Sequence, residues 1–282
     1  MLSCAGALMD PAGQPATAAP AFDLALLSDI GTNRENNEDA CGSHAESESC
    51  VIFAVADGVG GYEGGEIASA QAVEVTLSAF RESPFDWGPA KRLHRAVQQA
   101  NIEIHNRALT VPELRRMATT LTASVVSDGV LYAAHVGDCR LYHIRRGKVR
   151  QITKDHTVVQ ERVRMGLISA ARARHHPERS ALSRSLGREL IVSVDRITLS
   201  LEQDDQLLVC TDGLYNVIED DELGKIIRGV EAATACRRLI DLANQRGTAD
   251  NLTVAIFTSK IDPPPSRPAW HQRMASFFRR RG

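Results

Sequence analysis

The sequence predicts a domain of the α+β class that contains antiparallel strands, and two observations carry this prediction. Between residues 119 and 153, apolar runs rich in β-branched residues alternate with tight turns, among them Asp128-Gly129 and Arg146-Gly147, a pattern typical of antiparallel strands. Residues 63–81 and 89–108 instead repeat apolar side chains at helical spacing, which predicts two amphipathic helices packed on a core.

The remaining elements follow along the chain. Strands are predicted at residues 22–28, 39–44, 50–56, 119–127, 130–136, 140–144, 148–153, 192–199, 206–211 and 251–259. Further helices are predicted at 157–165, at a short acidic-capped segment after Glu219, and at 232–245. Because short turns separate the four strands of residues 119–153, we expect them to pair in order as a meander. The polar, arginine-rich stretch of residues 157–182 reads as a flap-like segment.

Composition narrows the class of protein. The 282 residues suffice for a full core, and 43% hydrophobic with 24% charged residues is ordinary for a soluble globular chain. A net charge of −2 gives no overall attraction to nucleic acid or membrane. The six cysteines include no C-x-x-C pair, which favours reduced thiols. Without a secretory signal or a run of ~20 apolar residues, we expect a cytoplasmic protein.

Three regions are predicted. Residues 1–20, rich in alanine and proline, are expected to be a flexible leader, and residues 21–260 a single catalytic domain. Residues 261–282 combine a proline-rich linker with a basic amphipathic tail, in which Trp270 and Phe277 share a helical face. This tail is the one part we expect to be capable of contacting a membrane or a partner. The alternative is a frayed end, because isolated helices this short are marginal in water.

The chain is organised around a buried strand that ends in a carboxylate. Residues 51–56 are all apolar and lead directly into Asp57-Gly58, after which a helix begins. The strand delivers the carboxylate to a defined point, and the glycine lets the backbone approach a ligand. An Asp-Gly pair is also the commonest hairpin turn, as at Asp128-Gly129, so this pair alone is a weak signal.

The signal strengthens because the arrangement recurs. Four more aspartates stand where predicted strands begin or end, namely Asp39, Asp138, Asp212 and Asp250. Carboxylates gathered without counter-charge repel one another and lose hydration, so such a cluster indicates bound cations. Oxygen ligands without accompanying His or Cys favour Mn²⁺ or Mg²⁺ over Zn²⁺.

In order, the motifs resemble those of the type 2C metal-dependent protein phosphatases (the PPM family), serine/threonine phosphatases, and specifically their bacterial branch. The resemblance covers about residues 22–258. It runs through Arg34-Glu35-Asn36-Asn37-Glu38-Asp39, Asp57-Gly58-Val59-Gly60-Gly61, Met117-Ala118-Thr119-Thr120, Val136-Gly137-Asp138-Cys139-Arg140, Thr153-Lys154-Asp155-His156, Ser183-Arg184-Ser185-Leu186-Gly187, Thr211-Asp212-Gly213-Leu214 and Ala249-Asp250-Asn251. It implies an α-β-β-α sandwich of two antiparallel sheets flanked by helix pairs, which agrees with the antiparallel turns.

The resemblance also implies a ligand set for two divalent ions. Asp57 would bridge both ions, and the Gly58 carbonyl would bind one of them. Asp212 and Asp250 would bind the first ion, and Asp39 the second ion through water.

Further roles follow from the same resemblance. Asp138, with Asp212, would form a weaker third ion site. Arg34 would clamp the substrate phosphate, to which its planar fork of donors is suited. Glu38 and Asn251 would support the ligands without binding an ion.

The implied activity is hydrolysis of phosphoserine and phosphothreonine by a hydroxide that bridges the two ions, because divalent ions lower the pKa of bound water. The implied partners are phosphoproteins, including a bacterial Ser/Thr kinase and its substrates, and we expect a monomer. Two departures matter: Val59 and Tyr62 stand where many relatives carry a histidine, and Ala118 replaces the glycine that is usual before Thr-Thr. The proton donor to the leaving group is therefore open, with metal-bound water preferred over His156.

Two other functions are compatible with a cluster of carboxylates. A pseudophosphatase that only binds phosphoproteins is disfavoured because Arg34 and all five aspartates are present. A two-metal nuclease would need a basic groove with aromatic platforms, which 5% aromatic residues and a charge of −2 do not favour. A locally basic stretch does exist within residues 140–184, and we hypothesise that Arg162, Arg164, Arg172 and Arg174 draw an anionic substrate toward the site.

Overall fold

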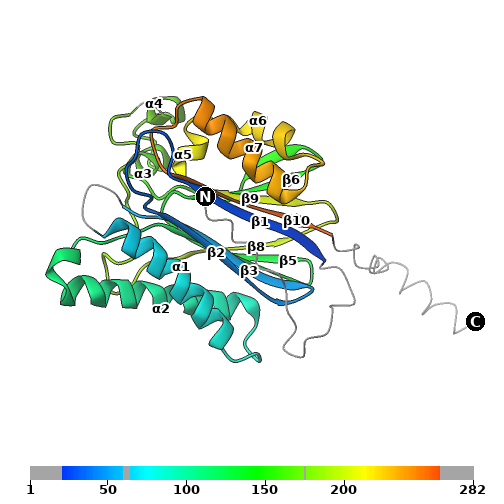
Figure 1. Ribbon diagram of the computed structural model, residues 1–282. Coiled ribbons are helices and arrows are strands. Elements are labelled where there is room, and N and C mark those ends of the chain that lie inside the picture. Colours follow the sequence, from blue (N-terminus) through cyan, green and yellow to red (C-terminus); the bar gives the residue numbers. More distant parts are fainter. Residues whose placement is uncertain (1–20, 60–63, 175, 261–282) are drawn as a thin grey trace, which may run out of the picture.

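The computed structural model describes residues 21–59, 64–174 and 176–260 of the chain (Figure 1). The leader, the tail and Tyr62 lie outside these residues. Two antiparallel sheets of five strands each lie face to face. The first sheet has the order β1 (Phe22–Asp29), β10 (Leu252–Ser259), β9 (Gln206–Cys210), β6 (Arg140–Arg145), β7 (Lys148–Gln151). The second has the order β2 (Asp39–Ser47), β3 (Cys50–Asp57), β4 (Leu121–Ser127), β5 (Val130–Val136), β8 (Asp195–Ser200).

Helices cover the outer face of each sheet (Figure 1). On the second sheet lie α1 (Gly65–Glu82) and α2 (Pro89–Thr110), followed by a 3₁₀ turn at Pro112–Leu114. On the first sheet lie α5 (Asp212–Tyr215), α6 (Asp220–Ile227) and α7 (Ala232–Gln245). The helices α3 (Val158–Arg164) and α4 (Ala170–Arg174) belong to the predicted flap segment. The predicted α-β-β-α architecture is confirmed.

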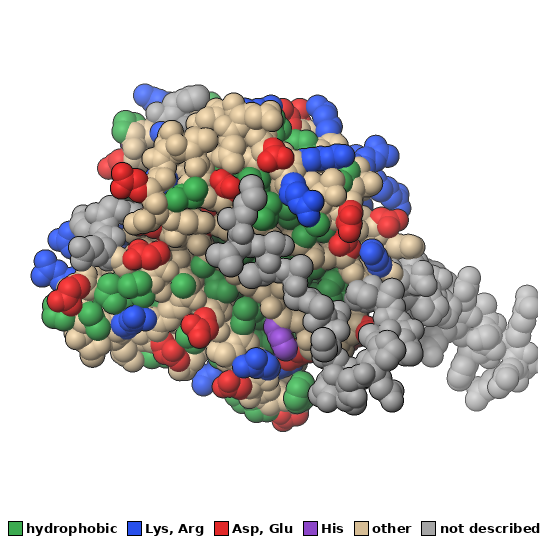
Figure 2. Space-filling view, in the orientation of Figure 1, with side chains coloured by type: hydrophobic (Ala, Val, Ile, Leu, Met, Phe, Trp, Pro, Cys, Tyr) green, Lys and Arg blue, Asp and Glu red, His purple; other side chains and the backbone are tan. Residues whose placement is uncertain are grey.

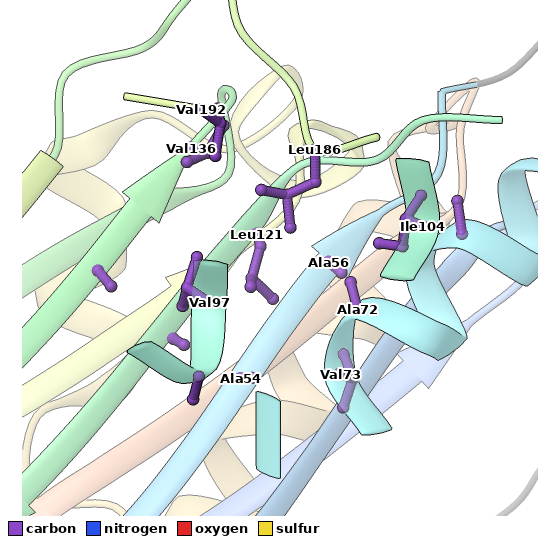
Figure 3. Close-up of a cluster of buried hydrophobic side chains, with 14 of the residues drawn as sticks. Ala54, Ala56, Ala72, Val73, Val97, Ile104, Leu121, Val136, Leu186 and Val192 are labelled. Carbon is purple, nitrogen blue, oxygen red and sulfur yellow. The ribbon is translucent and has the colours of Figure 1, made fainter. Parts of the chain in front are cut away.

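Three layers of apolar side chains hold these sheets and helices together. The strand β3 contributes side chains to two of these layers. Val51, Phe53 and Val55 lie between the sheets, while Ile52, Ala54 and Ala56 pack under α1 and α2. Side chains of a strand alternate between its two faces, so a strand buried on both faces reads as a continuous apolar run. Figure 3 shows the cluster beneath α1 and α2.

The meander expected for residues 119–153 is wrong. β4 and β5 pair in the second sheet, but β6 and β7 pair in the first. Instead of pairing with each other, β5 pairs with β8 and β6 pairs with β9. The chain crosses between sheets at Gly137, whose φ of 106° lies in the left-handed region. Both strands are largely buried on both faces, so their sequence does not distinguish pairing with each other from pairing in separate sheets.

Smaller differences concern element ends. β2 continues to Ser47 because it keeps pairing with the start of β3, where a loop was expected. β8 begins at Asp195, and α4 forms within a stretch expected to be a loop. Asp205, in the turn between β8 and β9, is buried and accepts hydrogen bonds from Arg145 at 2.8 and 2.6 Å. No helix within the described residues is long and apolar enough to cross a membrane.

We expect Gly137→Ala to destabilise the protein strongly. An added Cβ would lie 2.4 Å from the Thr120 side chain, and the left-handed backbone adds strain. Together these should lower the free energy of unfolding by more than about 2 kcal/mol in urea titrations. Gly229→Ala is the matched control, because Gly229 has a φ of 67° and nothing within 4 Å of the added Cβ. Equal losses in the two variants would contradict the role given to the close approach.

Candidate active site

A cleft of about 550 Å³ gathers most of the predicted site residues. Its walls include Arg34, Glu38, Asp57, Gly58, Asp138, Asp212 and Asp250, which come from loops and strand ends far apart in the sequence. Asp39 and Asn251 are not among the lining residues. The sequence therefore identified every charged residue of the wall except Arg188.

Asp57 is held through its backbone. Its N–H donates to Thr120 Oγ1 at 2.9 Å, and its carbonyl accepts from Thr119 Oγ1 at 2.8 Å. Its carboxylate accepts no hydrogen bond from the described residues. Across the β2–β3 pair, Asp57 stands opposite Asp39. The pairing register of the sheet thus brings together the two carboxylates expected to serve the second ion.

Asp39 links the two sheets. Its Oδ2 accepts a hydrogen bond of 2.8 Å from Thr211 Oγ1, at the end of β9. The Thr211 hydroxyl in turn accepts from the Thr253 N–H at 2.9 Å, on β10. The hydroxyl of Thr211 therefore bridges the edge of the second sheet to the centre of the first.

Asn251 holds the loop that carries Arg34. This buried side chain accepts from the Glu38 N–H at 2.9 Å. Its amide donates to the carbonyls of Ile30 and Asn36 at 2.8 and 2.9 Å. All of its contacts are therefore to backbone, and its place in the site is to shape residues 30–38.

Gly58 is confined by close backbone neighbours. Its N–H donates to the Glu38 carbonyl at 3.0 Å, and an added Cβ would lie 2.3 Å from the Gly65 carbonyl oxygen. The Glu38 carboxyl group itself lies against the start of α1, with its carbon 3.1 Å from the position of a Cβ on Gly65. Glycine at these two positions lets β3, the loop before β2 and α1 converge.

The charge of Asp212 acts on Asp138 and raises its pKa after the larger effect of burial. Asp212 begins α5; its Oδ2 accepts from Asn216 Nδ2 at 3.1 Å, whereas its buried Oδ1 has no hydrogen-bond partner in the described part of the chain. Asp138 is buried in the turn after β5. A buried carboxylate oxygen without a donor is costly, which suits a ligand position.

Arg34 contacts Asp250. Its Nη2 lies 2.8 Å from the Asp250 carboxylate, and both side chains are more than a third exposed. Asp250 also accepts from the Asn251 N–H at 2.9 Å. The expected phosphate clamp and an expected ion ligand therefore neutralise each other in this structure.

The other four carboxylates carry raised pKa values. Burial is the main cause, and it raises the pKa of Asp39 to about 7, of Asp138 to about 8 and of Asp212 to about 6. Burial, followed by repulsion from the other four aspartates, raises the pKa of Asp57 well above its usual value. Clustered carboxylates that resist ionisation in this way are suited to a cation.

The donor set fits hard divalent ions. Carboxylate and carbonyl oxygens are the ligands that Mn²⁺ and Mg²⁺ take, and the unpartnered Asp212 oxygen is available to one. Across residues 21–59, 64–174 and 176–260, no three Asp, Glu, His or Cys side chains are already arranged around one point as ligands.

Several lining residues were not among the predicted site residues. Thr120 lies in a quoted motif, but nothing in the local pattern singled out Arg188 or residues 180–182 of the flap. Conversely, Arg162 pairs with Glu178 at 2.8 Å and Arg164 with Glu161 at 2.7 Å. These pairs neutralise two of the arginines expected to attract an anionic substrate.

The contacts of His156 are those of a structural residue. It is 2% exposed, and its Nδ1 accepts from the Gly137 N–H at 3.1 Å. It is absent from the lining of the cleft.

Two antiparallel sheets between helix layers, with aspartates from both sheets around one cleft, define the class of type 2C metal-dependent phosphatases. Residues 31–253 match the family model described as protein phosphatase 2C. The chain belongs to the protein phosphatase 2C family.

Two similar proteins are serine/threonine phosphatases by name. The serine/threonine phosphatase stp of Listeria monocytogenes is 34% identical over 238 residues, which cover 81% of this chain and 92% of that protein. The serine/threonine protein phosphatase PstP of Mycobacterium tuberculosis is 36% identical over 236 residues, 82% of this chain but 44% of PstP.

Solved structures agree as well. The catalytic domain of PstP in complex with two manganese ions has a TM-score of 0.74 and 33% identity, covering 84% of this chain and 97% of that chain. Stp1 from Staphylococcus aureus has a TM-score of 0.79 and 27% identity, covering 89% and 99%.

These findings confirm the family, the fold and the enzyme class. The chain is a PP2C-type serine/threonine protein phosphatase of the bacterial type, its substrates are phosphoproteins, and its family depends on divalent metal ions. They do not support the pseudophosphatase alternative. Acidic and basic side chains are interspersed on the face shown in Figure 2, which gives a nuclease no support on that face.

We expect the metal-free protein to lose stability as the pH rises from about 6.5 to 8. Asp39 and Asp138 have folded-state pKa values of about 7 and 8 against 3.8 unfolded. The folded state therefore binds more protons in this window, and its advantage disappears as they leave. Below pH 6.5 the lowered pKa values of His135 and His156 act in the opposite direction, so the window excludes them.

Urea unfolding in EDTA at several pH values measures this slope. Adding Mn²⁺ should raise stability most near pH 8, where the carboxylates are deprotonated. Asp57→Asn should flatten the EDTA slope and reduce the stabilisation by Mn²⁺, because it removes one of the repelling charges. Asp241→Asn, an exposed change on α7, is the control. A slope in Asp57→Asn equal to that of the unchanged protein would contradict the assigned repulsion.

Proposed function

We propose that this phosphatase hydrolyses phosphoserine and phosphothreonine esters in the carboxylate-lined cleft with the help of two divalent ions. Asp39, Asp57, Asp212, Asp250 and the Gly58 carbonyl would hold the ions. One observation carries the proposal: Asp57 is crowded by four other carboxylates and accepts no hydrogen bond from the described residues. When bound, Mn²⁺ or Mg²⁺ supplies a water activated for direct attack on phosphorus.

The chain's own residues orient this chemistry. Thr119 and Thr120 hold the Asp57 backbone, and Thr211 holds the Asp39 carboxylate, so these two groups keep their positions. Arg34 would leave Asp250 and bind the phosphate, for which its donors are suited in geometry and permanent charge. Asp138, with Asp212, is the proposed site of a weaker third ion.

The biological setting is proposed from the sequence. We propose that the enzyme acts as a cytoplasmic monomer and opposes a bacterial Ser/Thr kinase, dephosphorylating that kinase or its substrates. Membrane contact, if the enzyme makes any, would use the basic tail of residues 261–282, which lies outside the described residues.

Substitutions in the cleft should separate chemistry from binding. Asp57→Ala should abolish Mn²⁺-dependent release of phosphate from a phosphothreonine peptide, because the ions lose their shared ligand. Arg34→Ala should mainly raise KM, by about tenfold, since one charge-assisted contact to phosphate is lost. Asp241→Ala is the control and should behave as the unchanged enzyme. Full turnover in Asp57→Ala, or hydrolysis of nucleic acid rather than phosphopeptide, would refute the proposed reaction.

A substrate trap should test the kinase proposal. Asp212→Asn keeps the size of the side chain while removing a ligand charge, so phosphoproteins should remain bound without turnover. Mass spectrometry of proteins retained from a bacterial lysate, and released by inorganic phosphate, should identify a phosphorylated Ser/Thr kinase. A retained set that is the same after prior dephosphorylation of the lysate would argue against this partner.

A further inference from the structure

Residues 187–191 form a loop that is anchored at both ends in the core. Leu186 is fully buried and Val192 is 6% exposed, and both belong to the cluster beneath α1 and α2. Figure 3 shows Leu186 near Leu121 and Val192 beside Val136. The loop between these two anchors therefore has little freedom to shift.

One face of α2 binds the backbone of this loop. Asn101 is fully buried; it accepts from the Gly187 N–H at 2.9 Å and donates to the carbonyls of Glu189 and Leu190 at 2.9 and 3.0 Å. Gln98 and His105 continue the same helical face and bind the carbonyls of Val192 and Gly187 at 2.9 and 3.0 Å. With the backbone bound inward, the side chains of residues 188–191 are left to the surface.

The loop is also tied to the strand that carries Asp57. Leu186 and Thr119 exchange backbone hydrogen bonds of 2.8 and 3.3 Å, and Thr119 Oγ1 donates to the Asp57 carbonyl. Gly187 has a φ of 92°, and an added Cβ would lie 2.5 Å from Ile104. Packing and hydrogen bonds therefore fix the position of this loop relative to Asp57.

Arg188 projects from this rigid loop into the wall of the cleft. It is exposed, and no hydrogen bond or ion pair joins its side chain to any of the described residues. Three other arginines in this part of the molecule form ion pairs: Arg34 with Asp250, Arg162 with Glu178 and Arg184 with Asp195, at 2.8 Å each. Arg188 is thus a positioned cation with its charge available to an incoming ligand.

We infer that Arg188 is a specificity residue that recognises a second negative charge beside the phosphorylated residue of the substrate. This inference rests on the proposed function, in which Arg34 and the ions receive the phosphate that is removed. Arg188 reaches the cleft from a different segment, together with Ser180, Ala181 and Leu182. Its planar fork suits either a carboxylate or a second phosphate, so the preferred substrates are phosphopeptides with acidic or additionally phosphorylated flanks.

Three phosphothreonine peptides that differ only in flanking residues test the inference, with p-nitrophenyl phosphate as a substrate that has no flank. One peptide has neutral flanks, one has glutamates, and one carries a non-hydrolysable phosphonate analogue of phosphoserine. The unchanged enzyme with Mn²⁺ should prefer the two anionic peptides about fivefold in kcat/KM, through KM, as expected for one exposed ion pair. The preference should shrink in high salt.

Arg188→Gln should remove the preference and leave hydrolysis of p-nitrophenyl phosphate unchanged, which also shows that the variant is folded. Arg188→Lys should restore part of it. Arg238→Gln, the same charge change at an exposed position on α7, should keep it. If only one anionic peptide is preferred, the result identifies which anion, carboxylate or phosphate, Arg188 binds.

Two results would overturn the inference while leaving the proposed function intact. One is a preference that survives in Arg188→Gln, and the other is an equal loss on every substrate, which would place Arg188 on the transferred phosphate instead. An unchanged enzyme that releases phosphate from none of the substrates in Mn²⁺ would contradict the proposed function itself.

Discussion

Repulsion among five aspartates is the constraint on which the cleft depends. Ladder hydrogen bonds bring Asp39 opposite Asp57, and backbone and hydroxyl contacts from Thr119, Thr120 and Thr211 hold both in place. Folding thus buries and gathers carboxylates that would stay hydrated and apart in a free chain, and burial first, followed by repulsion, raises the pKa of Asp57. The layered core supplies the stability that tolerates this crowding.

The same constraint explains why the support of the site is polar but uncharged. Two of the proposed ion ligands, Asp39 and Asp212, accept from the Thr211 hydroxyl and the Asn216 amide, and not from lysine or arginine. A cation built permanently into the cluster would neutralise the charge that an ion is meant to meet. Arg34 is the exception, and it is more than a third exposed and bound to the outermost carboxylate, Asp250.

Much of this site was predictable because its signals are local. A strand that ends in Asp-Gly before a helix, and the return of that pattern at Asp212, can be read from adjacent residues. Pairing across the crossover at Gly137 was not predictable, because β5 and β6 are largely buried on both faces and fit either sheet. Arg188 was missed for a related reason: its position is set by Asn101 on a distant helix. Sequence likewise does not show that Glu178 forms an ion pair with Arg162, one of the arginines expected to attract an anionic substrate.

The ion pair between Arg34 and Asp250 links the two binding events of the proposed reaction, namely binding of the phosphate and binding of an ion. Asp250 is the only one of the five aspartates that forms an ion pair with a described residue. A phosphate that takes Arg34 leaves Asp250 without its counter-charge, which strengthens the attraction of Asp250 for an ion. An ion bound to Asp250 in turn releases Arg34 for the phosphate. In the proposed reaction each ligand would remove an obstacle to the other, so their binding free energies would be coupled with positive sign, and by linkage the coupling would be equal in both directions.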